Sequence, residues 1–315
     1  MSDKTKIIPV VLFVYKRTDT LRVTLESLRR NKPVFLIVYS DAAKSPDDEQ
    51  SVANVRRMVS EIDWCEKELH FSSENKGLGR SIKEGLSEVF SRFEAAIVCE
   101  DDLEFVEGTL EYMSRALKHY ANDERVMSVT GYTNSYITPD DVVDQPYFDG
   151  RFECWLWGTW RRVWEWMSKQ TALEMMNKVK ERGEDPYFWG GDLPYMAKTE
   201  IRSNIWAVRM CYLHILNKGL VVRPPWSMVN HIGWGDGSTN CCSKNWEYNG
   251  ELRLVPPMPK SWPVAILNSQ CSVLHRKMYK RPWSDIFPRA VPFVRRILRK
   301  VRIRGLVGAF PCSNA

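Results

Sequence analysis

Short apolar runs alternate with segments of helical periodicity over the first hundred residues, and no other feature of the sequence constrains the fold as much. The apolar runs rich in Val or Ile are residues 7–15, 34–39 and 95–99, and residues 69–73, Leu-His-Phe-Ser-Ser, are a plausible further strand. Between them, apolar residues recur every three or four positions in residues 20–31, 45–62 and 79–93. Buried strands that alternate with amphipathic helices predict a mostly parallel sheet covered by helices, which is an α/β fold.

The second of these helical segments opens with a start signal. Ser45 is placed to cap the helix, Pro46 suits its first turn, and Asp48 stands where the acid of a capping box belongs. We therefore predict that a helix begins at this Ser-Pro-Asp-Asp sequence and that the Ser45 and Asp48 side chains close its first turn.

Polar residues follow each predicted strand at the point where the strand ends. Arg17 follows the first strand, Asp41 the second, residues 75–80 the third and residues 100–102 the fourth. In open α/β sheets, ligands bind at the carboxyl ends of the parallel strands. The sequence therefore predicts one crevice to which four strand ends contribute polar groups.

Glu100, Asp101 and Asp102 need an explanation, because three adjacent carboxylates repel one another. A hard divalent cation, Mg²⁺ or Mn²⁺, binds carboxylate oxygens and takes its other ligands from water and substrate phosphates. The triplet therefore predicts a metal that binds a diphosphate, and the alternative is a solvated acidic turn before a helix that begins near Gly108. No glycine-rich phosphate loop follows the first strand, which argues against a Walker nucleotidase or a Rossmann dehydrogenase.

Four stretches carry a resemblance to a known family: PVVLFVYKRTDTL, LIVYSDAAK, ENKGLGRSIKEGL and IVCEDDLEFVEGTLEYM. Together they resemble the GT-A glycosyltransferases and, more narrowly, the Golgi mannoside N-acetylglucosaminyltransferase family and its bacterial relatives in polysaccharide and glycan assembly. The resemblance extends over about residues 7–235. It implies a GT-A fold, in which a Rossmann-like, mostly parallel central sheet is flanked by helices.

The same resemblance implies roles for the residues of the crevice. Asp102 corresponds to the family's ligand for Mn²⁺ or Mg²⁺, and the two acids before it correspond to those that face the ribose and the donor sugar, Asp101 and Glu100. The residues that would contact the rest of the nucleotide are Arg17, Asp41 at the base, Lys76 and Arg80. For Arg80, a cation on the helix surface is the alternative.

An inverting transferase also needs a general base, and here the sequence departs from the family. Asn204 stands where the family has an acid, and an amide does not accept a proton at neutral pH. The candidate bases are Asp192, Glu200 and Asp236, of which we favour Asp192 because glycines and aromatic residues precede it. The alternatives are that Asp192 only caps a helix that begins at Leu193, and that the enzyme is retaining and needs no such base.

Residues 153–167 hold five tryptophans. Tryptophan rings stack well on sugars, but Trp160 and Trp164 stand four positions apart, which is the spacing of two residues on one face of a helix. For these two residues we predict packing in the core rather than contact with an acceptor sugar.

Residues 229–240 resemble a late loop of the family that contains a histidine. His231 would complete the metal shell, since imidazole binds Mn²⁺, and the alternative is a structural histidine. Three glycines in the loop suggest a flexible lid that closes over the donor: Gly233, Gly235 and Gly237.

The net charge of +6 is concentrated near the C-terminus. Residues 276–304 hold eleven Lys or Arg and one Asp, so they carry +10 and the rest of the chain −4. Apolar residues at helical spacing within this stretch are Val294, Ile297, Leu298 and Val301. The pattern predicts a basic amphipathic helix that binds an anionic membrane surface through residues 289–304. One alternative is that this helix packs on the rest of the protein, and another is that it binds nucleic acid. We expect it to bind the membrane surface, and we expect no nucleic-acid partner.

The N-terminal sequence MSDKTKIIPVVLFVY holds only about nine apolar residues, too few for a membrane span or a cleaved signal peptide. Eight cysteines without a CxxC pair favour reduced thiols. We therefore expect a cytoplasmic protein that associates peripherally with the inner face of the membrane.

These features predict one GT-A catalytic domain, residues 1–275, with a donor half to about Tyr132 and an acceptor half over residues 133–275, followed by a basic tail over residues 276–315. The predicted function is a metal-dependent glycosyltransferase. It would use a nucleotide sugar, first of all a UDP-sugar, and a glycan or lipid-linked acceptor in surface polysaccharide or lipopolysaccharide assembly. One alternative is an inactive GT-A-fold carbohydrate-binding or scaffold protein, which the missing acid favours. The other is a nucleotidyltransferase, although KRTDT lacks the glycines that this would need.

Overall fold

The computed structural model describes residues 7–234, 249 and 252–281. The strands of its central sheet are β1 (Val10–Val14), β2 (Phe35–Ser40), β3 (Glu66–Phe71), β4 (Ala95–Glu100), β6 (Val126–Thr130), β7 (Tyr147–Asp149), β8 (Trp157–Trp160) and β9 (Leu220–Arg223). They lie in the order β3-β2-β1-β4-β8-β6-β9-β7. Strands β8 and β7 run antiparallel to their neighbours, and the other adjacent pairs are parallel. The predicted fold class, an α/β protein with a mostly parallel central sheet flanked by helices, is confirmed.

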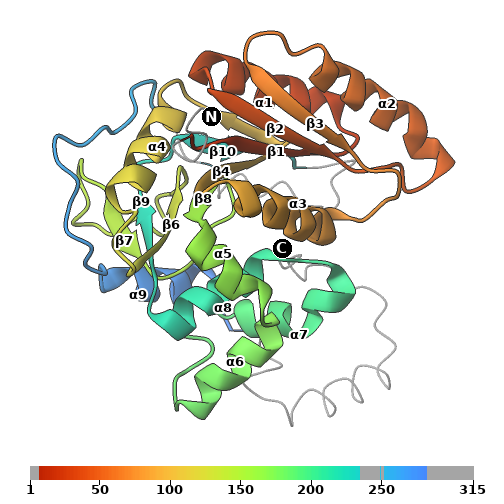
Figure 1. Cartoon of the computed structure of the whole chain (residues 1–315). Helices are drawn as coiled ribbons and strands as arrows, with labels where there is room; N and C mark the ends of the chain where they lie inside the picture. The colour runs from red at the N-terminus through yellow and green to blue at the C-terminus, as the bar shows by residue number, and fades with distance from the viewer. Residues whose placement is uncertain (1–6, 235–248, 250–251, 282–315) are drawn as a thin grey trace, which may run out of the picture.

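Helices cover both faces of this sheet. They are α1 (Thr18–Asn31), α2 (Pro46–Ser60), α3 (Leu78–Arg92), α4 (Thr109–His119), α5 (Arg161–Ser168), α6 (Ala172–Glu181), α7 (Leu193–Ser203), α8 (Ala207–Asn217) and α9 (Gln270–Met278). Helices α1, α2 and α4 lie on one face and α3 and α5 on the other, and α6, α7 and α8 pack together beyond α5 (Figure 1). A second, two-stranded sheet pairs β5 (Leu103–Phe105) with β10 (Val229–His231). Within the described part of the chain, no helix is both long enough and apolar enough to cross a membrane.

The first four strands and three helices lie where the apolar pattern placed them. The largest difference is at β3, which begins at Glu66, three residues before the predicted run. This strand is at the edge of the sheet, and its side chains are partly buried or exposed. The apolar run therefore marked only the end of the strand.

The predicted capping box of α2 is wrong, although the helix does begin at Pro46. The Ser45 side chain makes no capping hydrogen bond. The Asp48 carboxylate instead accepts hydrogen bonds from the Tyr15 hydroxyl and the Lys16 ammonium, both at 2.8 Å. The competing interaction comes from the segment after β1, which the local sequence of α2 does not reveal.

Trp160 and Trp164 belong to the core, as predicted, with only 5% and 2% of their surface exposed. The Trp160 indole donates a hydrogen bond to the carbonyl of Leu117 in α4 at 3.2 Å. The Trp164 indole donates one to the Ser87 hydroxyl in α3 at 3.0 Å. The two rings thus attach β8 and α5 to helices on opposite faces of the sheet.

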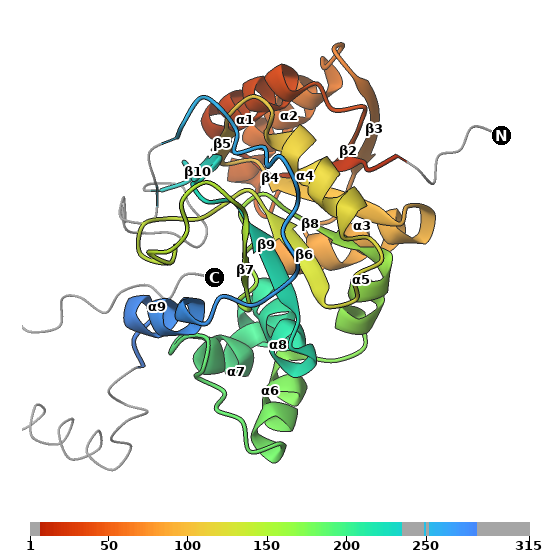
Figure 2. The same ribbon diagram turned by 90° about the vertical axis from the view of Figure 1, so that its left-hand side faces the viewer.

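Helix α9 is held by a buried cluster of ionisable side chains. The Asp149 carboxylate at the end of β7 lies 2.6 Å from the Arg223 guanidinium in β9 and 2.7 Å from His275 Nε2 in α9. All three side chains are at most 1% exposed. The segment before α9 runs beside α4 and β7, where Leu267 pairs with Phe148 (Figure 2). Helix α9 continues past residue 275, the predicted domain limit, and the predicted helix at 289–304 lies outside the described residues.

Candidate functional site

The carboxyl ends of β1 to β4 open onto one cleft of about 860 Å³. This volume is within the range of pockets that hold small molecules and cofactors. The cleft is lined by most of the residues that the sequence pattern singled out: Arg17, Asp41, Lys76, Glu100, Asp101, Asp102 and His231. Arg80, Asp192 and Glu200 do not line it, and Asp236 lies outside the described residues.

The small second sheet brings His231 to the acidic triplet. Strands β5 and β10 pair antiparallel, with His231 opposite Leu103, and the Ile232 N–H donates to the Asp102 carbonyl at 2.8 Å. His231 Nε2 therefore lies 3.2 Å from Asp102 Oδ2, and Arg17 Nη1 lies 4.0 Å from the same oxygen. Residues from three distant parts of the sequence thus meet at one carboxylate.

The three acids of the triplet differ in their electrostatics. Burial and the charge of Asp102 raise the pKa of Asp101 to about 7, and burial with the charges of Asp102 and Asp101 raises the pKa of Glu100 well above its usual range. Burial acts in the same direction on Asp102, but the charge and hydrogen bond of His231 and the charge of Arg17 outweigh it and lower the pKa of Asp102. Asp102 is therefore the acid that keeps its negative charge most firmly.

Asp102 and His231 fit two ligands of one divalent cation. In an octahedral site with metal–ligand bonds of about 2.1 Å, adjacent ligand atoms lie about 3 Å apart. The 3.2 Å between Asp102 Oδ2 and His231 Nε2 matches that separation. Carboxylate and imidazole are both ligands of Mn²⁺, and the remaining positions would be left for water and phosphate oxygens.

Trp155 fixes the orientation of the His231 ring, and the sequence pattern did not single it out. The two rings stack with centroids 4.9 Å apart and 17° between their planes, while Trp234 meets the imidazole edge-on at 4.7 Å. The tryptophan-rich segment was visible in the sequence. Which of its rings faces the cleft depends on where β8 begins, and the local pattern does not determine this.

Position 233 has room only for glycine, because the side chains of Asp102 and Arg17 lie close to its Cα. A Cβ atom at this position would lie 2.1 Å from Asp102 Oδ2 and 2.9 Å from Arg17 Nη1. The Gly233 carbonyl also accepts a hydrogen bond from Arg17 Nη1 at 3.0 Å. The sequence pattern assigned this glycine to a flexible lid, and its neighbours Gly235 and Gly237 lie outside the described residues.

Asp41 and Asn204 hold the loop that follows β3. The Asp41 carboxylate accepts hydrogen bonds from the N–H groups of Lys76 and Gly77 at 2.9 and 2.8 Å. The Asn204 amide, at the C-terminus of α7, donates to the Lys76 carbonyl at 3.2 Å. A carbonyl oxygen needs a donor, so the amide at this position has a structural explanation that the sequence alone did not offer.

The three remaining predicted residues form ion pairs. Arg151 binds Asp192 with two hydrogen bonds of 3.0 and 2.7 Å, and Arg209 Nε binds Glu200 at 2.7 Å. The half-exposed Arg80 pairs with acids of its own surface at 2.7 and 3.2 Å, in agreement with the helix-surface alternative. The partners of Asp192 and Glu200 do not line the cleft, whereas Glu84, one of the two partners of Arg80, does.

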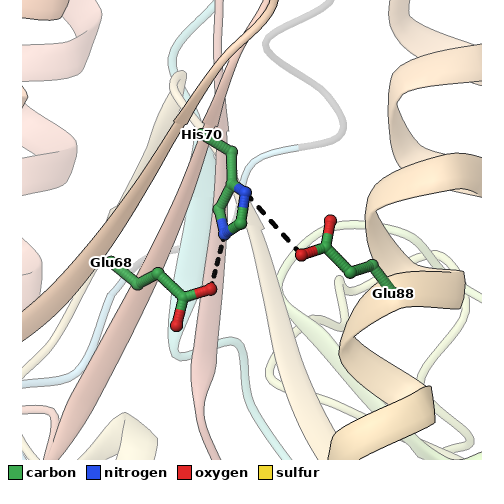
Figure 3. A group of neighbouring side chains, drawn as sticks. All are labelled: Glu68, His70 and Glu88. Carbon is green, nitrogen blue, oxygen red and sulfur yellow. Dashed lines mark hydrogen bonds and ion pairs between the residues drawn. The ribbon is translucent and has the colours of Figure 1, made fainter.

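Glu68, His70 and Glu88 form a second ionisable group at the β3–α3 side of the cleft (Figure 3). The two glutamates approach different nitrogens of the ring, with Glu68 2.6 Å from Nε2 and Glu88 3.7 Å from Nδ1. Arg92 binds Glu68 with two hydrogen bonds, which lower the pKa of Glu68 to about 2. Because one ion could use only one ring nitrogen and Glu68 is already paired, this group is an ion-pair network that joins β3 to α3.

No family model and no curated protein matches the chain. One similar solved structure is the mannosyltransferase PcManGT from Pyrobaculum calidifontis in complex with GDP-Man and Mn²⁺. Its sequence is 13% identical to this chain, and the TM-score is 0.43. The match covers 97% of this chain and 77% of that chain. A 4-diphosphocytidyl-2C-methyl-D-erythritol synthase from Anaerococcus prevotii is 14% identical, with 52% of this chain and 74% of that chain covered and a TM-score of 0.34. Similarities this distant support no conclusion about function.

Proposed function

We propose that the protein is a metal-dependent glycosyltransferase that takes a sugar from a nucleoside-diphosphate sugar, first of all a UDP-sugar. The observation that carries this proposal is the convergence of Asp102, His231 and Arg17 at the carboxyl ends of the strands. Two ligands for a divalent cation and one guanidinium suit a diphosphate, which carries several negative charges. The sequence resemblance to GT-A glycosyltransferases supports the same reaction.

In this proposal Asp102 and His231 hold Mn²⁺ or Mg²⁺. The bound ion would neutralise charge on the departing diphosphate. Arg17 donates hydrogen bonds to a phosphate oxygen, and the loop held by Asp41 and Asn204 presents Lys76 to the nucleotide. The two remaining acids of the triplet face the ribose and the donor sugar, where carboxyl groups form hydrogen bonds with hydroxyl groups.

The acceptor is proposed to be a glycan or a lipid-linked sugar of surface polysaccharide or lipopolysaccharide assembly. The basic amphipathic pattern of residues 289–304 supports attachment to the inner face of the membrane, where lipid-linked acceptors are found. The division into a catalytic domain, residues 1–275, and a basic tail, residues 276–315, belongs to the same proposal.

Calorimetric titration of the full chain with UDP, GDP and dTDP tests the proposal. At least one nucleotide should bind in the presence of Mn²⁺, and chelation of the metal should weaken that binding at least tenfold. Failure of all three nucleotides to bind would overturn the proposal. Metal-dependent binding with no release of diphosphate from any nucleotide sugar would point instead to an inactive carbohydrate-binding protein.

Replacement of Asn204 with Asp should destabilise the fold by about 1–3 kcal/mol, because a carboxylate cannot donate to the Lys76 carbonyl and leaves that acceptor unpaired. The change should also weaken nucleotide binding, since this loop forms one side of the cleft. Urea unfolding and calorimetry measure the two effects. Asn217→Asp removes a similar amide-to-carbonyl bond, to Leu213, and should leave nucleotide affinity unchanged. Equal weakening in both variants would contradict the role given to this loop.

A further inference from the structure

One acid beside the cleft, Glu153, has no counter-ion among the described residues. It lies in the loop between β7 and β8, and its Oε1 accepts a hydrogen bond from the Cys154 N–H at 3.0 Å. No lysine, arginine or histidine of the described chain lies within ion-pair distance of it, and its Oε2 receives no hydrogen bond from a described residue. Asp192 and Glu200 differ, because an arginine binds each of them. No described cation therefore occupies the Glu153 carboxylate, in contrast to those of Asp192 and Glu200.

The topology of the sheet directs the loop that carries Glu153 toward the acidic triplet. Strand β8 runs antiparallel to β4, with Trp157 opposite Val98. Residues just before Trp157 therefore return toward the residues just after Val98, where the triplet lies. Cys154 and Trp155 line the cleft, and the Trp155 ring stacks on His231. Glu153 directly precedes these two residues.

A second, smaller cavity of about 60 Å³ adjoins the cleft at this point. Glu153, Arg151 and Asp192 line it, and it shares Cys154 and Trp155 with the cleft. A cavity of about 10–15 Å³ is enough for one water molecule, so this one can admit the hydroxyl group of an acceptor. Burial raises the pKa of the Cys154 thiol, and the charges of Glu153 and Glu100 raise it further, as expected if the thiol lies near both carboxylates.

The loop that carries Glu153 is firmly anchored. The Arg223 guanidinium donates to the Arg151 carbonyl at 3.0 Å, and Asp149 Oδ1 accepts from the N–H groups of Gly150 and Arg151 at 2.7 and 3.1 Å. The Arg151 side chain is fixed in turn by its two hydrogen bonds to Asp192. A carboxylate on so well-anchored a loop meets the requirement that a general base be held in place before the substrate arrives.

We propose that Glu153 is the general base of the transfer, an inference that rests on the proposed glycosyltransferase function. The proton of the acceptor hydroxyl moves to Glu153 Oε2 as the acceptor oxygen forms its bond to the anomeric carbon. The bond between that carbon and the phosphate oxygen breaks, and the diphosphate leaves with the electron pair. A single displacement of this kind inverts the configuration at the anomeric carbon.

Glu153→Gln keeps the size of the side chain and removes its basicity, so it tests the role directly. The probes are UDP-glucose, UDP-N-acetylglucosamine, UDP-galactose, GDP-mannose and dTDP-glucose, with Mn²⁺ and a panel of p-nitrophenyl glycosides as acceptors. The variant should release diphosphate at least 100-fold more slowly, because general bases contribute about 10²- to 10⁴-fold to rate. Its affinity for the nucleoside diphosphate with Mn²⁺ and its unfolding midpoint should be unchanged. Nuclear magnetic resonance of the wild-type product should show inversion.

Glu165→Gln, an exposed glutamate on α5, is the matched control and should behave as the wild type. A rate for Glu153→Gln within threefold of the wild type would overturn the proposal, and so would retention of configuration in the product. A 100-fold loss at Asp192→Asn with intact Glu153→Gln activity would assign the role to Asp192 instead. If the wild-type chain binds no nucleoside diphosphate, the glycosyltransferase function itself fails, and the base role fails with it.

Discussion

Replacement of Asp102 with Ala is expected to weaken Mn²⁺-dependent binding of the nucleoside diphosphate at least 100-fold, which corresponds to about 2.7 kcal/mol. The variant removes one of the two protein ligands proposed for the ion, the carboxylate that lies 3.2 Å from His231 Nε2. The charge of Arg17 lowers the pKa of Asp102. Burial and neighbouring charge raise the pKa values of Asp101 and Glu100, so these acids do not offset the loss of Asp102. Calorimetric titration with and without Mn²⁺ measures the change.

The exposed Asp63 provides the control, because Asp63→Ala changes the net charge by the same amount away from the cleft. Its Mn²⁺-dependent affinity should equal that of the wild type. Wild-type affinity in Asp102→Ala would show that the triplet is the solvated acidic turn that the sequence left open as an alternative. It would also remove the main support for the proposed reaction.

Replacement of Asp149 with Asn should lower the free energy of unfolding by about 3–5 kcal/mol, the usual cost of removing one partner from a buried ion pair. Burial acts to raise the pKa of Asp149, but His275 and Arg223 outweigh it and hold that pKa well below its usual range, so the cluster depends on an ionised carboxylate. Burial lowers the pKa of His275, so the lasting positive charge opposite this carboxylate is that of Arg223. An amide leaves the Arg223 guanidinium buried without a counter-charge. Guanidinium chloride unfolding of the full chain measures the loss.

Asp123→Asn is a suitable comparison, because it breaks the ion pair with Arg125, whose side chain is 58% exposed. Exposed pairs contribute about 1 kcal/mol or less, so this variant should remain close to the wild type. A loss below about 1 kcal/mol in Asp149→Asn would mean that the buried cluster does not hold β7, β9 and α9 together in the way described.

The parallel half of the fold could be predicted because its signals are local. Apolar runs of strand length and repeats of three or four residues identify β1 to β4 and α1 to α3, and the rule for strand ends then brings Arg17, Asp41 and the acidic triplet to one crevice. His231 could be proposed only through the resemblance. Its place beside Asp102 depends on β5 and β10, short strands more than a hundred residues apart in the sequence.

What the sequence could not supply is the pairing of charges. Asp192 and Glu200 resembled candidate bases because their arginine partners are recognised only in three dimensions, with Arg151 41 residues before Asp192. Glu153 was overlooked for the complementary reason, since the absence of a partner is also visible only in the fold. Asn204, taken as a missing acid, turned out to donate a hydrogen bond to the loop after β3.

The attachment of α9 limits the distance between the small cavity and the basic segment that follows this helix. Tyr279 follows this helix, packs over the Arg151 guanidinium with 4.0 Å to the ring centroid, and lines the small cavity. Arg289 is the tenth residue after Tyr279, and ten residues of chain span at most about 36 Å. If residues 289–304 rest on a bilayer as proposed, this tether keeps the cavity within that distance of the lipid headgroups. An acceptor carried on a lipid would then be concentrated near the cavity by confinement to the same surface, an advantage that a free sugar in bulk solution would not share.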